Sequence, residues 1–150
     1  MEITIGGRTI PLTLTTFELI AIQEEIGCTV GQIRDQVFGI EHNLETDEYK
    51  CMLSTDKDKM RKFGTLIRIM GNAGLEEAGQ EADLTDKWIL RHIRPAMIIP
   101  YVLVVSGAID EAMQVESAGK PEGPVDEKLE EEKQKKEQES SPTGGSSPAD

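Results

Sequence analysis

Apolar residues recur every three or four positions over most of residues 15–113, which is the spacing of helices that bury one face. A first helix is predicted between Thr15 and Gly27. Thr15 and Glu18 have the spacing of a capping box, and a glycine commonly ends a helix. The apolar face of this helix is expected to consist of Phe17, Ile20, Ala21 and Ile26.

Two more helices are predicted before residue 80. Thr29 and Gln32 repeat the capping-box spacing and predict a short helix that ends near Gly39. Residues 40–54 lack a clear period, and we expect a loop there with at most one helical turn. Thr55 or Asp56 can cap a third, largely buried helix. Its periodic positions are Met60, Phe63, Ile67, Met70, Gly74 and Ala78.

The last helical region follows Thr85 and extends to Met113. Pro95 should break it, because the residue before a proline avoids the helical conformation, and should then start a new helix. Pro100 is expected to bend that helix or to shorten its regular part.

The N-terminus has a different pattern. Residues 2–5 alternate polar and apolar, "GGR" can turn, and "TIPL" returns, which predicts a β-hairpin within residues 1–14 with Pro11 on an edge. The predicted fold is therefore mainly α: a small domain of about four to five helices with an N-terminal β-hairpin.

The run Ala96–Ile109 is apolar and could be a membrane segment, a core helix or an interface. As a helix it would rise about 21 Å, against about 30 Å of hydrocarbon, which argues against a membrane span. The run is apolar nearly all round, so it needs cover on every side. That cover could come wholly from this chain, or one side could await another copy or an apolar helix of a different protein.

Composition divides the chain near Glu116. Only 37% of the 150 residues are hydrophobic, and residues 117–150 are rich in Gly, Pro, Ser, Glu and Lys. Such a segment buries too little apolar surface to offset the entropy of ordering it. We therefore expect a helical domain over residues 1–116 and a disordered, low-complexity charged tail over residues 117–150.

The net charge of −12 disfavours nucleic acid as a partner, since phosphate binding requires a basic surface. Lys87, Arg91 and Arg94 nevertheless form a basic stripe. Either this stripe is a solvated face that pairs with acidic residues elsewhere, or it docks an acidic partner, for which another copy is one candidate.

No pattern of catalytic or metal-binding residues is evident. "GNAGLEEAG", Gly71–Gly79, lacks the Lys-Ser/Thr ending of a phosphate loop, and is better explained by close packing of another helix or by the end of the third helix. His42 and His92 are far apart in sequence, and Cys28 and Cys51 have no ligand spacing. The sequence thus predicts a protein without enzymatic activity, cofactor or metal. "MEITIGG" lacks the features of a signal peptide, so a reduced, cytoplasmic location is expected.

Two stretches, "IGGRTIPLTLTTFELIAIQEEIG" and "DLTDKWILRHIRPAMIIPYVLVVSGAIDEAM", give residues 1–116 a resemblance to a known family. The chain resembles the small tail assembly chaperones of long-tailed bacteriophages and prophages of Gram-positive bacteria. The resemblance implies a protein of the host cytoplasm that binds the apolar, helical tape measure protein. It would promote polymerisation of tail tube protein around the tape measure, and would be absent from the mature virion.

The resemblance also implies a longer product, made by programmed ribosomal frameshifting, that recruits tail tube protein. This chain would be the short product, with slippery codons near Lys133–Lys136. Apolar faces around Ile98–Val105 would cover stripes of the tape measure, beside the basic stripe. The expected protein-interaction residues are Trp88, Arg91, Arg94, Met97, Ile98, Tyr101, Val102 and Val105.

A second hypothesis is an acidic interaction protein, similar to an anti-repressor or antitoxin, that blocks a basic nucleic-acid-binding partner. Its binding should weaken as salt rises, whereas apolar chaperoning should respond far less. Self-association into a homo-oligomer is compatible with both hypotheses.

Overall fold

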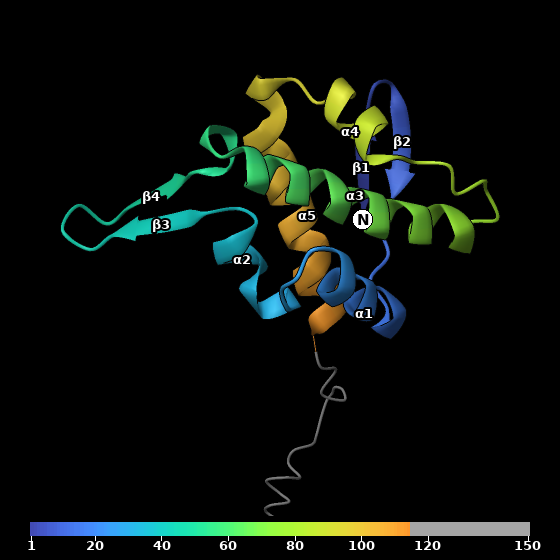
Figure 1. Cartoon of the computed structure of the whole chain (residues 1–150), viewed down its shortest axis with the longest axis horizontal. Coiled ribbons are helices and arrows are strands. Elements are labelled where there is room, and N and C mark those ends of the chain that lie inside the picture. The colour runs from blue at the N-terminus through green and yellow to red at the C-terminus, as the bar shows by residue number, and fades with distance from the viewer. Residues whose placement is uncertain (115–150) are drawn as a thin grey trace, which may run out of the picture. The chain divides into compact units, whose positions relative to one another are not determined.

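The computed structural model describes residues 1–114, and the predicted tail and frameshift region lie outside the described residues. The domain is mainly α, with five α-helices and three short 3-10 helices among these residues (Figure 1). Two antiparallel β-hairpins accompany them. The prediction of a mainly helical domain with an N-terminal hairpin is confirmed, and the second hairpin was not predicted.

Helix α3 (Lys57–Glu77) runs across the middle of the domain and contacts α1 (Thr16–Glu25), α4 (Asp86–His92) and the N-terminal hairpin (Figure 1). Its N-cap is Asp56, whose side chain accepts hydrogen bonds from two backbone N–H groups of the first turn. As predicted, the helix is largely buried. Its fully buried side chains include Phe63, Leu66, Ile67, Met70 and Leu75.

The predicted N-terminal hairpin is present as β1 (Glu2–Ile5) and β2 (Arg8–Pro11), with Ile3 paired to Ile10. Gly6 and Gly7 form the turn with positive φ angles of 58° and 78°, which glycine adopts without strain. Tyr101 Oη donates a 2.6 Å hydrogen bond to the carbonyl oxygen of Thr4. This bond ties the first strand to α5 (Ile98–Met113), the last helix of the domain.

Helix α1 has the predicted capping box and ends before Gly27. The prediction of its buried face is confirmed at Ile26 but wrong at Phe17 and Ile20. Phe17 is 75% exposed and Ile20 is 51% exposed, whereas Glu18 and Ile22 are buried. Apolar residues occur around much of this helix, so the sequence fits more than one buried stripe. Packing against α3 selects the stripe of Glu18, Ile22 and Ile26, spaced four residues apart.

The second predicted helix is short. It begins as a 3-10 turn, η1 (Val30–Gln32), and continues as α2 (Ile33–Gln36). The predicted capping box is present, since Thr29 N donates to Gln32 Oε1 at 2.9 Å.

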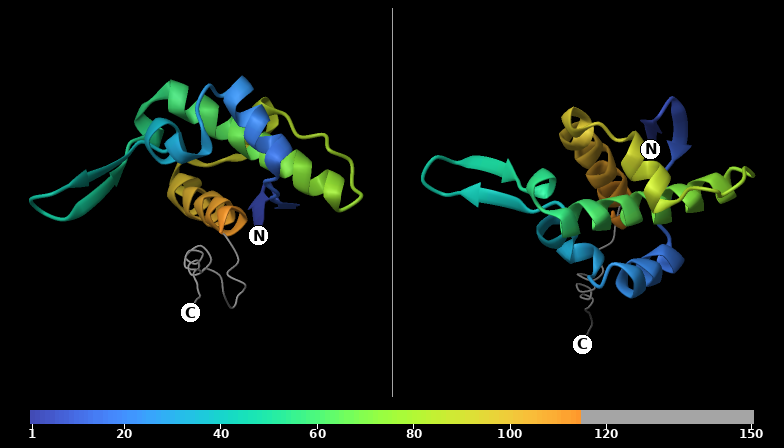
Figure 2. Two further views of the ribbon diagram at one scale, coloured as in Figure 1. Left: turned by 90° about the horizontal axis from the view of Figure 1, so that it is seen from below. Right: turned by 45° about the horizontal axis from the view of Figure 1, so that its top comes forward.

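Residues 40–51 form the unexpected second hairpin, and the prediction of a loop there was wrong. Strands β3 (Ile40–Asn43) and β4 (Glu48–Cys51) pair antiparallel, with His42 opposite Tyr49. All residues from 41 to 50 are exposed, so the segment lacks the apolar alternation that marks a half-buried strand. The hairpin extends away from the helices, and η2 (Leu53–Thr55) leads the chain back into the core (Figures 1 and 2).

The predicted break at Pro95 is confirmed. Arg94 is extended, Pro95 starts the 3-10 helix η3 (Pro95–Met97), and α5 follows directly. Pro100 is only the third residue of α5. It lies within the first turn, where backbone N–H groups have no helical partner, so it removes no helical hydrogen bond there.

The segment Pro95–Met113 has 19 residues, and by length and composition alone it could cross a membrane. It is longer than the run Ala96–Ile109, so its length does not exclude a membrane span. Core helices pass the same test, and six side chains of α5 are buried in the domain. They lie in one hydrophobic core with side chains of β1, β2 and α3.

The cap of α3 gives a first prediction. The backbone N–H of Lys59 is the main cause of the lowered pKa of Asp56, because its hydrogen bond favours the carboxylate. Asp56→Ala should lower the melting temperature by about 3 °C at pH 7, whereas Asp56→Asn, which can still cap, should change it little. The stability that the Asp56 carboxylate contributes is fully present above the ordinary pKa of Asp. It is lost as pH falls through the lowered pKa of Asp56 in the folded domain. Thermal unfolding of all three proteins from pH 7 to pH 3 checks this; equal pH profiles for wild type and Asp56→Ala would contradict it.

Candidate protein-interaction surfaces

The structure divides the eight predicted interaction residues into two groups. The four on α5 are buried, which corrects the prediction that this face meets a partner. They lie at the i, i+3, i+4 and i+7 positions of one helix face, and that face packs into the domain's own core. These four residues are Ile98, Tyr101, Val102 and Val105.

The other four predicted residues lie at or near the surface. Trp88 is half-buried and its ring stacks on His92 with 4.4 Å between centroids. Arg91, Arg94 and Met97 are exposed. Arg94 lies beyond the end of α4, so the predicted stripe is not one continuous helix face, although Lys87 is also exposed. Among residues 1–114, none of these three basic side chains forms an ion pair.

The outer side of η3 and α5 presents exposed apolar side chains, of which only Met97 was among the predicted interaction residues. Leu103 is 68% exposed and Ile99 is 49% exposed, one helical turn apart. The sequence could not separate this side from the buried one, because α5 is apolar nearly all round. We call the exposed residues the α5 apolar face: Ala96, Met97, Ile99, Pro100 and Leu103.

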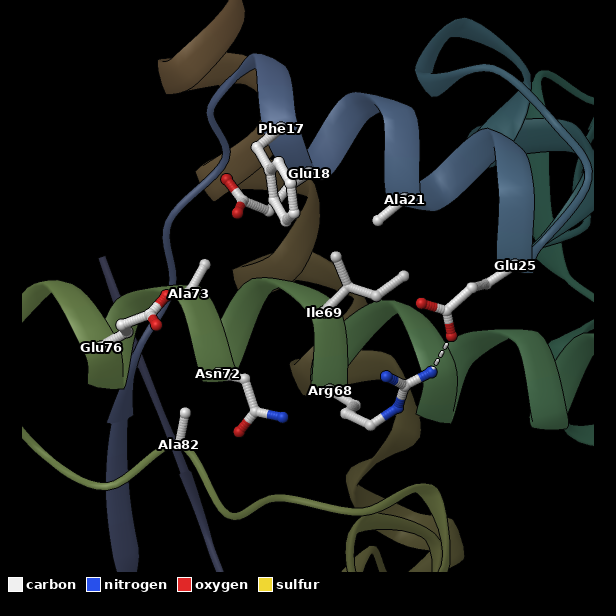
Figure 3. Close-up of a pocket in the computed structure, with 10 residues that line it drawn as sticks. All are labelled: Phe17, Glu18, Ala21, Glu25, Arg68, Ile69, Asn72, Ala73, Glu76 and Ala82. Atoms are coloured by element: carbon white, nitrogen blue, oxygen red, sulfur yellow. Dashed lines mark hydrogen bonds and ion pairs between the residues drawn. The ribbon is translucent and has the colours of Figure 1, made fainter.

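A groove between α1 and α3 is lined by polar and apolar side chains in equal number (Figure 3). At one end Arg68 of α3 forms ion pairs with Glu25 of α1 and with Asp86 of α4, the latter at 2.5 Å. Burial alone would lower the pKa of Arg68, but the hydrogen bonds that Arg68 donates to Glu25 and Asp86 outweigh it and raise the pKa. Since Arg68 pairs with carboxylates from two helices, the groove is best explained as a junction that holds α1 and α4 onto α3.

Gly71 and Gly74 of "GNAGLEEAG" lie within α3, and their role is close packing as predicted. The neighbour at Gly74 is, however, the backbone of Pro11 at the end of β2 and not another helix. Gly79 follows the helix with a φ of 76°.

Cys28 and Cys51 are free thiols, and burial raises the pKa of Cys28. Among residues 1–114, no three His, Cys, Asp or Glu side chains lie close enough to hold a metal ion.

An apolar cavity of about 110 Å³ opens where η2, the first half of α3, α4 and η3 meet. Several of its lining side chains are partly exposed, so the cavity reaches the surface. It is lined by Leu53, Met60, Phe63, Leu90, Ile93, Pro95 and Ile98.

The exposed part of the second hairpin, residues 41–50, is called the arm. The rings of His42 and Tyr49 stack at 4.3 Å, and Arg34 of α2 lies 5.8 Å above the Tyr49 ring. His42 Nε2 is 2.7 Å from Asp47 Oδ1. At the tip, Asn43 Oδ1 accepts hydrogen bonds from the next turn residues, and Leu44 is 85% exposed. These contacts give an isolated two-stranded hairpin a defined shape.

Comparison of the chain with protein-family models, with curated proteins and with solved structures found no match.

Proposed function

We propose that this domain is a binding module that covers an apolar helical segment of another protein, in the manner of a tail assembly chaperone. The observation that carries the proposal is the α5 apolar face. Five exposed apolar residues gather on one side of η3 and the first half of α5. Exposed apolar patches on small domains commonly mark sites of protein contact.

The α5 apolar face fits an apolar helix better than a small ligand. It lies on the outside of a helix and has no enclosing walls, and Ile99 and Leu103 are one turn apart. A partner helix with apolar residues at similar spacing could lie along it and bury both side chains. Arg94 and Met97, two of the predicted interaction residues, lie at the start of this face or just before it.

On this proposal the partner is a tape measure protein, and the location is the host cytoplasm during virion assembly. A longer product with the same domain would bring tail tube protein. Contacts through one small apolar face are weak and dissociate readily, which suits a chaperone that must be displaced.

A second prediction tests the α5 apolar face. When the tape measure protein encoded beside this chain is co-expressed with the wild-type chain, it should stay in the soluble fraction. Leu103→Ser should reduce that soluble fraction about tenfold, because it removes the most exposed large apolar side chain of the face. The free energy of unfolding of the Leu103→Ser variant should differ from wild type by less than about 0.5 kcal/mol, since the Leu103 side chain is largely in water.

Leu44→Ser is the matched control, because it removes an exposed leucine on the arm, away from α5. It should leave the tape measure protein soluble. If Leu103→Ser and wild type keep equal amounts in solution, the α5 apolar face is not the binding site. If the wild-type chain itself does not increase solubility, the chaperone function is wrong.

Salt separates this proposal from the alternative of an acidic protein that blocks a basic partner. Binding through apolar side chains should change little between low and high salt, whereas binding through acidic side chains should weaken strongly. The comparison requires only a pull-down of the same partner at two ionic strengths.

A further inference from the structure

The apolar cavity between η2, α3, α4 and η3 has a basic rim. Its seven lining residues are interleaved in sequence with Lys and Arg, and no acidic residue is adjacent to any of them. This is unusual in a chain with a net charge of −12. The basic residues adjacent to the lining residues are Lys59, Arg61, Lys62, Arg91 and Arg94. Lys59 pairs with Asp56, and Lys59 and Lys62 line a different hollow together with Glu41 of the same chain. The basic rim therefore consists of Arg61, Arg91 and Arg94, which are exposed and form no ion pair among residues 1–114.

The arm has the opposite character. Four of its ten residues are acidic and one, Lys50, is basic. At the tip, Leu44 is the most exposed large apolar side chain in the described domain, at 85%. The acidic residues on both sides of it are Glu41, Glu45, Asp47 and Glu48.

We propose that the arm docks on a second copy of this chain, with Leu44 in the apolar cavity and the acidic arm residues against the basic rim. The two surfaces match in size as well as in charge. An apolar cavity of about 150 Å³ can hold benzene, so one of about 110 Å³ suits a single aliphatic side chain. Opposite charges around an apolar anchor give an interface both its register and its rate of association.

The arm cannot fill the cavity of its own chain. Leu53, which lines the cavity, follows β4 by only two residues, so the cavity lies at the base of the arm. Four residues of strand rise about 13 Å, and the arm points away from the helices (Figures 1 and 2). Its tip is therefore directed away from its own cavity.

The same geometry favours a reciprocal dimer. When two arms lie antiparallel, each tip reaches the base of the other arm, and a two-fold axis relates the two identical contacts. The hairpin has only two strands, so its outer edges are also unpaired and can align in such a dimer. This self-association surface adjoins the α5 apolar face at Arg94 but includes none of its five residues, and the proposal does not depend on the proposed function.

The first test uses sedimentation equilibrium of the full chain over a range of concentrations. Wild type should form a concentration-dependent dimer. Leu44→Ser should raise the dimer Kd about 100-fold, because a buried anchor contributes about tenfold and the dimer contains two. Leu103→Ser, which removes the exposed leucine of α5, should dimerise like wild type.

The second test reverses the charges on each side. Glu45→Lys with Glu48→Lys changes the charge of the arm from −3 to +1. Arg91→Glu with Arg94→Glu changes the charge of the rim of Arg61, Arg91 and Arg94 from +3 to −1. Each double variant alone should be monomeric, since its arm and rim then carry like charges. Mixed together they should form a heterodimer, because both of its contacts pair opposite charges. Recovery on mixing also shows that both variants are folded.

Three results would overturn the proposal: a wild-type chain that stays monomeric up to about 1 mM, a Leu44→Ser variant that dimerises like wild type, or charge-reversed variants that do not associate on mixing. None of them bears on tape measure binding. Conversely, dimerisation that depends on Leu44 would support the dimer proposal even if the tape measure protein proved insoluble in every co-expression.

Discussion

Gly74→Ala should lower the free energy of unfolding by about 3 kcal/mol, although alanine is the better helix former. A Cβ atom at this position would lie 2.0 Å from the carbonyl oxygen of Pro11 and 2.5 Å from its carbonyl carbon. Both atoms belong to the backbone of β2, so no rotation of a side chain can relieve the overlap. The hairpin would have to move away from α3, and the packing of Ile10 on α3 would be lost.

Gly107→Ala in α5 is the matched control. Its Cβ would meet only the flexible Met1 side chain, at 3.3 Å from Cε. The gain in helix propensity, up to about 1 kcal/mol, should then leave stability unchanged or raised. Urea denaturation followed by the fluorescence of Trp88, the only tryptophan, measures both variants. Equal stability of the two glycine variants would show that β2 does not pack closely against α3 at Gly74.

Phe63→Ala should destabilise the domain by about 3–5 kcal/mol. Phe63 is 2% exposed, and its ring meets that of Phe38 edge to face with 5.9 Å between centroids. It also lines the apolar cavity, so its removal enlarges a space that is already unfilled. Domains of this size are stable by about 5–15 kcal/mol, and the variant should therefore approach unfolding at room temperature.

Phe17→Ala is the comparison that isolates burial, because Phe17 is the same residue type but 75% exposed. It should change stability by less than about 0.5 kcal/mol. Calorimetric unfolding of the two alanine variants tests the assignment of the core. A large loss for Phe17→Ala would mean that α1 buries the face that its sequence suggested.

Local signals along the chain predicted much of the fold. The capping residues at Thr15, Thr29, Asp56 and Thr85 lie where their helices begin, and Pro95 separates the last two. Such signals depend on neighbouring residues only, so they can be read without knowing the tertiary packing. The N-terminal hairpin was predicted for the same reason, from its alternation and its glycine turn.

The features that the sequence did not predict depend on distant contacts. Which side of α1 and α5 is buried is decided by α3 and the hairpin, because both helices are apolar on more than one side. The arm was missed because its strands are stabilised by polar pairs such as His42 with Tyr49, and not by an apolar face. The cavity and its basic rim draw residues from five elements, which no local pattern brings together.

The hydrogen bond from Tyr101 to Thr4 joins residues 97 positions apart. During synthesis the N-terminal hairpin therefore emerges long before the helix that covers it. Ile3 and Ile5 stay without that cover until α5 has been made, so the domain cannot complete its core until nearly all of it has left the ribosome. Contacts of such long separation in sequence also slow folding, and the pairing of β1 with α5 should be among the last steps.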